Sequence, residues 1–421
     1  MKFLILTLYV LLLSLSVSYS DWVEQTSGIS DDLNSVSAAD ENVAWTCGNS
    51  GKILRTTDGG LIWENAAGSQ IPASLDLYNI FGIDANNALV TGSDSNNTYV
   101  FKTINGGITW IQVFTQAGGF IDCILMGNPM IGFMYGDPVG GRWSLWGTIN
   151  GGITWDSSSF YIPQNGNETG WNNSMFFDRY GGVVWFGTNN TRVYRTFNLL
   201  NWSVQPTTGQ PNSYAVWFNS TTNGMTGGDS IMSTTNGGND WLSPLTQPLG
   251  TGIITGITGV SDNWWVTRYS TSIYYSPDNG STWFEDYAAP SGNYTHIAKA
   301  RNGSNIVLWA VRTEGGISRS EIPVGVAPVS NNIPKKYNLM QNYPNPFNPS
   351  TKIRFDIPNS GNVKLTIFDE LGREVAVLVN NKLNAGSYSA DFNGSNISSG
   401  VYFYRITAGD YTMTKKMILS K

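Results

Sequence analysis

The chain has 421 residues, enough for about two or three domains, and only 13 % of them are charged, while Gly (47), Trp (16) and Tyr (20) are abundant. This composition favours short strands and tight turns over helices. The formal net charge is −6, but the segment from residue 335 onward carries +5 and the remainder −11. An acidic body of this size argues against nucleic acid as a partner, because phosphate binding needs a basic surface.

The first twenty residues predict a secretory signal peptide. Lys2 is followed by the apolar run FLILTLYVLLLSL, and Ser18-Tyr19-Ser20 has the small-x-small form of a cleavage site. The run is shorter than the ~20 residues that a membrane span needs. We therefore expect residues 1–20 to be removed, leaving a mature chain that starts near Asp21 and has no membrane span.

A short cluster of Thr or Ser, Asp or Asn, Gly and Trp recurs down the chain. Its clear copies are RTTDGGLIWE (55–64), KTINGGITW (102–110), GTINGGITW (147–155), STTNGGNDW (233–241) and YSPDNGSTW (275–283), and a degenerate copy, RTFNLLNW, begins at Arg195. The Trp residues of the six copies are 47, 45, 47, 39 and 42 residues apart. A period in the forties, with several short strands in each repeat, predicts the blades of a propeller.

The residue types in this cluster suit a structural turn. An Asp or Asn side chain accepts hydrogen bonds from nearby backbone N–H groups, Gly adopts the positive φ of a tight hairpin, and Trp fills the space between sheets. We therefore interpret the cluster as scaffold and not as a ligand site. The residues assigned to it are Thr56, Asp58, Gly60, Trp63, Thr103, Asn105, Gly107, Trp110, Thr148, Asn150, Gly152, Trp155, Thr234, Asn236, Gly238, Trp241, Ser276, Asp278, Gly280 and Trp283.

The two ends of the repeat region predict the number of blades. DWVEQTSG, directly after the signal peptide, matches the strand that follows each turn, whereas residues 305–322 contain two blade strands with no turn or Trp after them. We expect the first strand, with Trp22, to complete the last blade, which gives seven blades over residues 21–322 and removes exposed sheet edges. The alternative is six blades with residues 21–28 as a free tail.

The TxDGGxxW pattern resembles the Asp-box, or BNR, repeat of sialidases, xyloglucan-active hydrolases, sortilin-type receptors and photosystem II assembly factors. The blade length and count are most similar to those of the assembly-factor-like propellers. The resemblance implies an all-β, seven-bladed β-propeller whose box turns lie on the blade periphery, away from the ligand mouth. Likeness of fold gives little information about function.

A second unit is expected after a linker over residues 323–334. Residues 335–421 alternate apolar and polar side chains in KIRFDI, VKLTIF and VYFYRI, which predicts a small C-terminal β-sandwich. This segment closely resembles the type A C-terminal sorting domain of the type IX secretion system; an ordinary sandwich packed on the propeller is the alternative. The resemblance implies passage across the outer membrane, with the type IX translocon as partner, to the cell surface or the medium. The residues that carry it are Tyr343, Pro344, Asn345, Pro346, Phe347, Asn348, Pro349, Gly400, Tyr402, Lys415 and Lys416.

Few residue types are available for catalysis. The chain has one His, His296, and two Cys, Cys47 and Cys123. These numbers leave little material for a His-rich metal site or a Ser-His-Asp triad and exclude a Cys-based zinc site, so we expect neither metal nor cofactor. We expect His296 to be an interior or channel-facing imidazole with a satisfied hydrogen bond, with a catalytic imidazole as the alternative. We expect the cysteines to be buried, unpaired thiols, with a disulfide as the alternative in an exported chain.

A glycoside hydrolase that uses two carboxylates is the enzyme alternative. The candidates are Asp122, Asp137, Glu168, Asp178 and Asp229, of which Asp137 in YGDPVGGRW and Asp229 in TGGDS both follow an apolar strand and precede a loop. The alternative is structural: the side chains of Asp137 and Asp229 would each cap their own turn. A sialidase is disfavoured, because the sequence has no Arg-Ile-Pro segment.

Propellers bind ligands at one mouth of the central channel, through loops. The longest such loop is predicted over 157–173, with Tyr161 and Trp171, and a second over 137–144, with Arg142 and Trp143. Aromatic side chains among Asn and Gln suit a sugar ring or an extended peptide; the alternative is that they fold back over the blade. The sequence thus predicts an exported, non-catalytic binding or scaffolding module for protein or glycan.

Overall fold

The computed structural model describes residues 22–178, 182–210, 212–303, 305–322, 326–330, 334–383, 385–394 and 397–421. The predicted signal peptide lies outside these ranges. Every regular element in the described part of the chain is a β-strand, and none of it forms a helix with the length and apolar character of a membrane span.

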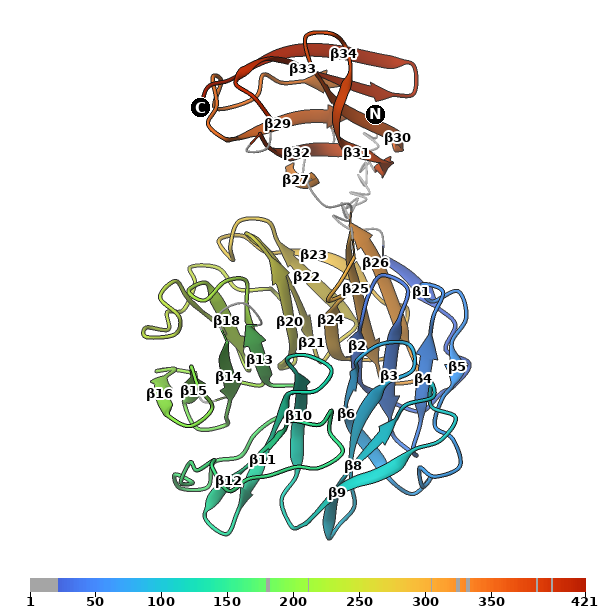
Figure 1. Ribbon diagram of the computed structural model, residues 1–421, viewed down its shortest axis with the longest axis vertical. Coiled ribbons are helices and arrows are strands. Elements are labelled where there is room, and N and C mark those ends of the chain that lie inside the picture. Colours follow the sequence, from blue (N-terminus) through green and yellow to red (C-terminus); the bar gives the residue numbers. More distant parts are fainter. Residues whose placement is uncertain are drawn as a thin grey trace, which may run out of the picture.

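Residues 22–322 form seven antiparallel sheets, which follow one another around a ring in chain order (Figure 1). We number these blades 1 to 7. The first strands are β2 (Leu33–Ala38), β6 (Asp76–Gly82), β10 (Ile121–Met126), β13 (Met175–Asp178), β17 (Ala215–Phe218), β20 (Ile254–Val260) and β24 (Tyr294–Lys299). The second strands are β3 (Ala44–Gly48), β7 (Ala88–Ser93), β11 (Gly132–Val139), β14 (Val183–Gly187), β18 (Gly224–Gly227), β21 (Asn263–Arg268) and β25 (Ile306–Arg312).

The third strands are β4 (Ile53–Thr56), β8 (Asn97–Thr103), β12 (Arg142–Thr148), β15 (Arg192–Thr196), β19 (Ile231–Thr234), β22 (Ser272–Ser276) and β26 (Ile317–Ile322). The outer strands are β5 (Glu64–Asn65), β9 (Ile111–Ala117), β16 (Trp202–Pro206) and β23 (Phe284–Ala288), together with β1 (Trp22–Gln25). Blades 3 and 5 have isolated bridges, Gly147 to Asp156 and Ser233 to Leu242, at the outer position.

The first strands form the inner wall of the ring. Each contacts the first strand of the next blade, and β24 contacts β2, so the circle of contacts is complete. A separate cluster of buried apolar side chains lies between each pair of successive blades, including blades 7 and 1. Both Cys47 and Cys123 belong to these clusters as buried free thiols, as the sequence predicted.

The N-terminal strand completes the last blade. β1 pairs antiparallel with β26 from Trp22–Ser320 to Gln25–Ile317, giving the strand order β1-β26-β25-β24. The Trp22 indole is buried against the core between blades 6 and 7, and its Nε1–H donates to Asp286 Oδ2 at 2.8 Å. The arrangement is consistent with the expected seven blades and disagrees with a free tail at residues 21–28.

Each clear copy of the repeated cluster is a turn that uses its own polar groups. In the first copy the Thr56 hydroxyl donates to Asp58 Oδ1 (2.8 Å) and accepts from the Gly60 N–H (2.9 Å), and Asp58 Oδ1 also accepts from the Ile62 N–H (3.0 Å). Gly59 and Gly60 have φ of 73° and 88°, which L-residues rarely adopt. The same hydroxyl-centred bonds recur at Thr103, Thr148, Thr234 and Ser276.

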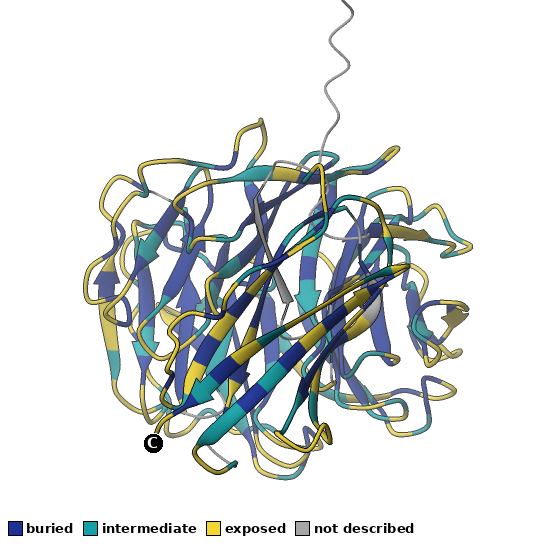
Figure 2. Ribbon diagram, turned by 90° about the horizontal axis from the view of Figure 1, so that it is seen from above, coloured by how far each residue is buried: buried dark blue, intermediate teal, exposed yellow. Residues whose placement is uncertain are grey.

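The C-terminal strands form two further four-stranded sheets around one apolar core. One sheet contains β27 (Val326–Ser330), β32 (Gly386–Asn393), β29 (Ser350–Ile357) and β28 (Asn338–Leu339). The other contains β31 (Glu374–Leu383), β30 (Gly361–Phe368), β33 (Gly400–Ala408) and β34 (Tyr411–Leu419). Buried and exposed residues alternate along these strands, whereas the inner propeller strands are mostly buried (Figure 2).

The expected linker over residues 323–334 is partly wrong. Residues 326–330 form β27, which pairs with β32 at the edge of its sheet. Pro328 lies within this strand, and an edge strand tolerates Pro because one side of its backbone needs no partner. The segments 323–325 and 331–333 lie outside the described residues.

Candidate binding site in the central channel

The propeller has two faces of different construction. Each box turn is bonded to the hairpin between the first and second strands of its blade; the Gly59 N–H, for example, donates to the Asn42 carbonyl at 3.0 Å. We call this side the box face. The opposite side, the loop face, carries the hairpins between second and third strands and the connections between blades, including residues 157–173.

The structure places the four predicted ligand-binding residues in different environments. Tyr161 is 62 % exposed and Arg142 is exposed on the loop face. Trp171 is 37 % exposed, and its ring stacks on Tyr214 with centroids 4.0 Å apart. The prediction for Trp143 is wrong. Trp143 lies in β12, is 1 % exposed, and donates its indole N–H to Glu168 Oε1 at 3.0 Å. Its side chain belongs to the core between blades 3 and 4 and does not reach a ligand.

The predicted loop over 137–144 is also shorter than expected. β11 extends to Val139 and β12 begins at Arg142, so only Gly140 and Gly141 connect the two strands. Both glycines have positive φ, 63° and 82°, which permits this tight reversal. The strand register explains the burial of Trp143, because side chains in a strand alternate between its two sides.

The two preferred candidate carboxylates, Asp137 and Asp229, lie on different blades. Asp137 is half-buried at the end of β11 and accepts a hydrogen bond from the Gly170 N–H at 2.7 Å. Asp229 is exposed on blade 5, where its Oδ2 accepts from the Asn212 amide at 3.1 Å. The acidic neighbour of Asp137 is Asp122, which is 3 % exposed and whose Oδ2 lacks a hydrogen-bond partner.

Burial decides the protonation of this aspartate pair. Burial, and then the charge of Asp137, hold the pKa of Asp122 well above its usual range. Burial also raises the pKa of Asp137, against the opposing effect of the Gly170 N–H bond. Of the other candidates, Glu168 is buried in a bonded position with Trp143 and Tyr194 as donors.

A cavity of about 450 Å³ occupies the centre of the ring. Its walls come from the first strands of all seven blades: β2, β6, β10, β13, β17, β20 and β24. The volume lies within the ~300–1,000 Å³ of typical small-ligand sites. This channel is the one place in the described propeller that every blade helps to build.

Asn173 occupies the loop-face end of the channel. It is the last residue of the 157–173 connection, which leads into β13 of blade 4, and its φ is 65°. Its side chain bonds to residues on the opposite side of the ring. Its Oδ1 accepts from Ser35 Oγ (2.7 Å) and Asn79 Nδ2 (2.8 Å), and its Nδ2 donates to the Asn34 carbonyl (3.2 Å). The channel is therefore bridged at this end by bonds from blade 4 to blades 1 and 2.

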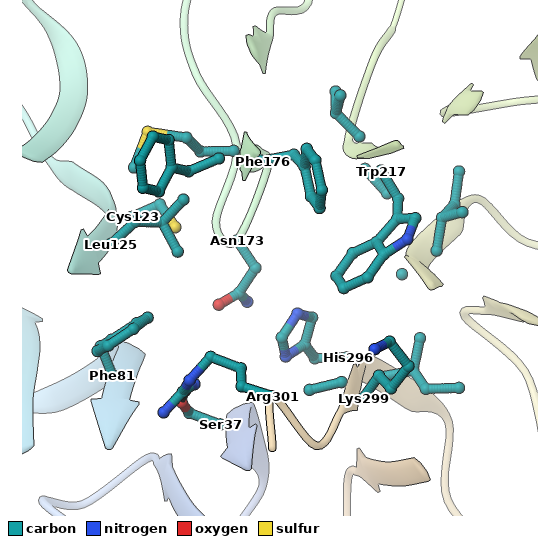
Figure 3. A pocket seen from close by; sticks show the side chains of 18 of the residues that line it. Ser37, Phe81, Cys123, Leu125, Asn173, Phe176, Trp217, His296, Lys299 and Arg301 are labelled. Atoms are coloured by element: carbon teal, nitrogen blue, oxygen red, sulfur yellow. Dashed lines mark hydrogen bonds between the residues drawn. The ribbon is translucent and has the colours of Figure 1, made fainter. Parts of the chain in front are cut away.

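His296 lines the same end of the channel, as the sequence predicted. Its Nδ1 accepts a hydrogen bond from the Val36 N–H at 3.2 Å. Burial lowers its pKa to about 4, so the imidazole is neutral at neutral pH. Figure 3 shows His296 and Asn173 close together in the middle of the cavity. They provide a polar but uncharged floor.

The opposite end of the cavity reaches the box face, where the exposed residues Ser220 and Asn302 line it. Arg301 donates to Ser37 Oγ at 2.9 Å and to the Gly82 carbonyl. Its guanidinium carbon lies 4.3 Å from the centre of the Phe81 ring, which is a cation–π distance.

Aromatic and charged side chains face each other across the box-face part of the cavity. The Phe176 and Trp217 rings, on blades 4 and 5, have centroids 4.8 Å apart. Lys299 and Arg301 come from blade 7, and Figure 3 places them across the cavity from the two rings. Asp178 at the end of β13 also lines the cavity.

Sequence reasoning missed most of these channel residues. The available signal was their position: MFFD (175–178), AVWF (215–218) and IAKAR (297–301) each lie immediately before a buried second strand. An aromatic or cationic side chain on such a first strand points either toward a neighbouring blade or into the channel. Which of the two it faces depends on the strand register, which the sequence does not state.

The predicted sorting residues lie around the last strand. The Phe347 side chain is buried, its N–H donates to the Ile418 carbonyl at 2.9 Å, and Asn345 Oδ1 accepts from the Ile418 N–H at 2.9 Å. Tyr343 is 82 % exposed. Tyr402 is buried, and its hydroxyl donates to the Ser398 carbonyl at 2.8 Å. The YPNPFNP segment thus attaches to β34, the strand that contains Lys415 and Lys416.

Comparisons with known proteins separate the two parts of the chain. A family model described as a secretion system C-terminal sorting domain matches residues 341–420. Among solved structures, YCF48 bound to D1 peptide is similar with 16 % identity and a TM-score of 0.58, over 72 % of this chain and 98 % of that one. YCF48 from Cyanidioschyzon merolae has 19 % identity and a TM-score of 0.56, over 71 % and 98 %. The WD40 β-propeller domain of Doa1 has 8 % identity and a TM-score of 0.54, over 71 % and 96 %.

A search of curated protein sequences gives no match. At the identities above, the likeness to solved structures shows the fold alone, which is a β-propeller. The sorting-domain match indicates type IX secretion, to the cell surface or the extracellular space. The chain is therefore a β-propeller followed by a secretion system C-terminal sorting domain.

Proposed function

We propose that this protein is an exported, non-catalytic binding module that holds a protein or glycan ligand in the central channel of its propeller. In this proposal residues 1–20 are a signal peptide, residues 21–322 are an Asp-box propeller, and the sorting domain directs export. The sorting domain begins with β27 and extends to the C-terminus. The box turns serve as scaffold in each blade.

The observation that carries the proposal is the cavity of about 450 Å³ to which all seven first strands contribute. Aromatic rings on one side and cations on the other give such a cavity both apolar contact area and specific polar contacts. A related fold has been solved as YCF48 bound to D1 peptide, which supports a peptide as one class of ligand. The exposed Tyr161 and Arg142 on the loop face are a second candidate surface.

The test is a binding panel of peptides and oligosaccharides, measured by calorimetry on residues 22–421. Ala298→Phe adds a ring to the channel wall, because Ala298 lines the cavity on β24. Ala117→Phe adds the same ring on the exposed end of β9 and serves as the control. We expect Ala298→Phe to weaken binding at least tenfold and Ala117→Phe to leave it unchanged, with both variants folded by circular dichroism.

An unchanged affinity in the folded Ala298→Phe variant would place the site outside the channel. Tyr161→Ala then tests the loop face directly. If its affinity falls while that of Ala298→Phe does not, the ligand binds over the 157–173 connection and the proposed site is wrong.

A glycoside hydrolase is the second candidate function, and the buried Asp122 beside Asp137 is the observation that favours it. Two neighbouring carboxyl groups with raised pKa values can retain a proton for a leaving group. Asp137→Asn should then reduce release of new reducing ends from a polysaccharide panel by about 100-fold or more, while Asp229→Asn has no effect. Absence of new reducing ends with the wild-type protein would rule out this candidate for the panel.

A further inference from the structure

We propose that the channel takes an apolar group that ends in a carboxylate, inserted from the box face. In this arrangement the apolar group lies among Phe81, Phe176 and Trp217, and the carboxylate lies at the rim, beside Lys299 and Arg301. The inference rests on the proposed function and names the chemical class of its ligand.

The first argument is the shape of the channel. The Asn173 side chain bridges the loop-face end through its bonds to Ser35, Asn79 and Asn34. A polymer passing through the ring would have to break these bonds. The box-face end has no comparable bridge among the described residues, and exposed Ser220 and Asn302 line it. A chain end or a small molecule therefore fits this cavity better than a threaded chain.

The second argument is the lining of the cavity. Apolar side chains on the inner strands line it, such as Phe81 and Leu125, together with the Phe176 and Trp217 rings (Figure 3). Burial of an apolar group against such a wall contributes about 25 cal/mol for each Å² removed from water. Neutral His296 adds no charge at the floor. A charged group at that depth would be desolvated without a counter-charge, so the floor favours an uncharged group.

The third argument is the distribution of charge. The rest of the chain outside the sorting domain carries an excess of eleven negative charges, yet Lys299 and Arg301 both line this cavity, against one carboxylate, Asp178. Ser37, the Gly82 carbonyl and the Phe81 ring hold the Arg301 guanidinium in one orientation. A fixed guanidinium loses little conformational entropy when it meets a planar carboxylate. The two cations therefore select an anion at the rim of an apolar cavity.

Two sources could supply this chemistry: the free C-terminus of a peptide with an apolar last residue, or a free aromatic acid. The probes that distinguish them are the fluorescein-labelled peptide Gly-Gly-Leu-Phe with a free C-terminus, the same peptide as its C-terminal amide, and 3-phenylpropionate as a competitor. Binding is measured by fluorescence anisotropy on residues 22–421 at 50 mM and 500 mM salt. The variants are Lys299→Gln and, as a matched control on the blade 1 surface, Lys52→Gln.

We expect the free acid to bind at least tenfold more tightly than the amide at 50 mM salt, and this difference to shrink at 500 mM salt. Lys299→Gln should weaken binding of the acid at least fivefold and leave binding of the amide unchanged, whereas Lys52→Gln should change neither. Displacement by 3-phenylpropionate at an affinity equal to that of the peptide identifies a free acid as sufficient. A much weaker displacement identifies a peptide C-terminus.

Equal affinity for acid and amide, or no binding of either probe, overturns the inference. The salt dependence provides an answer even if Lys299→Gln does not fold, because it needs only the wild-type protein. Failure here is distinct from failure of the proposed function: a neutral peptide or oligosaccharide whose binding is lost in Ala298→Phe would keep the channel as the site and exclude the carboxylate as its determinant.

Discussion

The carboxyl group of Asp122, a residue of β10, is buried beside Gly170, and its Oδ2 has no hydrogen-bond partner. A methyl group on Gly170 would lie 2.2 Å from this oxygen, so any larger residue here would displace the Asp122 carboxyl group. Burial and the charge of Asp137 together raise the pKa of Asp122. The 157–173 connection, which was expected to bind ligand, therefore also covers the Asp122 carboxyl group, whose Oδ2 has no hydrogen-bond partner.

This raised pKa predicts a pH dependence of stability. The unfolded chain ionises Asp122 near pH 4, whereas the folded chain does so only at higher pH, so the folded state retains an extra proton between the two values. The contribution of Asp122 to stability is therefore at its maximum at and below the unfolded pKa, and it falls as the pH rises toward the folded pKa. Asp122→Asn cannot ionise, so its free energy of unfolding should change less between pH 4 and pH 8 than that of the wild type.

Urea unfolding at several pH values measures this difference. Asp229→Asn, on exposed blade 5 surface, is the control and should keep the wild-type pH dependence. An identical dependence in Asp122→Asn and wild type would show that Asp122 is already ionised in the folded protein at low pH.

The box turn can be tested through a single hydroxyl. Thr56→Val removes the group that accepts from the buried Gly60 N–H and donates to Asp58, which should cost about 1–2 kcal/mol of unfolding free energy. Thr57→Val, at the exposed neighbouring position, should change it by less than about 0.5 kcal/mol. Urea denaturation of both variants gives the comparison, and equal losses would contradict a specific role of the Thr56 hydroxyl.

At the scale of elements, the seven blades share one plan but not one set of polar contacts. The indole N–H groups of Trp22 and Trp110 have acceptors at 2.8 Å, whereas those of Trp63, Trp155 and Trp241 are buried without one. The Trp63 ring instead makes an edge contact with Trp309, with centroids 5.4 Å apart. Apolar packing between blades is therefore the common function of these rings.

The closing strand depends on such packing, which leads to a prediction for β1. Trp22→Ala removes a buried indole from the core between blades 6 and 7 and leaves Asp286 without this donor, so we expect a loss of about 3–5 kcal/mol. Trp171→Ala, at a partly exposed ring on the loop face, should cost less. Thermal and urea unfolding measure both, and a smaller loss for Trp22→Ala would argue that blade 7 is stable without β1.

At the scale of the whole molecule, two cores of different construction share one chain. The propeller is stabilised by apolar clusters between successive blades, and the C-terminal sheets by a single apolar core. β27 pairs within the C-terminal sheet and not with a blade. The sorting domain can therefore be removed at residue 323 without taking a strand from the propeller.

Deletion of residues 323–421 should leave the melting temperature of the propeller unchanged and abolish its export across the outer membrane. Cell fractionation and immunoblotting locate the truncated protein, which we expect to stay inside the outer membrane. A reporter protein with a signal peptide, fused to residues 323–421, is the positive control and should be exported. Normal export of the truncated propeller would contradict the sorting role of this domain.

Local patterns in the sequence were sufficient to predict the repeat, the closing strand and the sorting domain. The turn around Asp58 is built from bonds within a few residues, so its chemistry is visible in the sequence itself. The match of DWVEQTSG to other outer strands similarly needs only the repeat. Because the chain has one His and two Cys, the sequence alone argued against a His-rich metal site, a Ser-His-Asp triad and a Cys-based zinc site.

The tertiary structure alone decided which side chains meet. Asn173 and Ser35 are 138 positions apart, and they are bonded only because the ring brings blade 4 opposite blade 1. Strand register buried Trp143 in β12, whereas Tyr161, in the connection between β12 and β13, is exposed. The sequence by itself determined the blades, because their turns are local; the channel and its lining were decided by ring closure, because that site is made of one short strand from every blade.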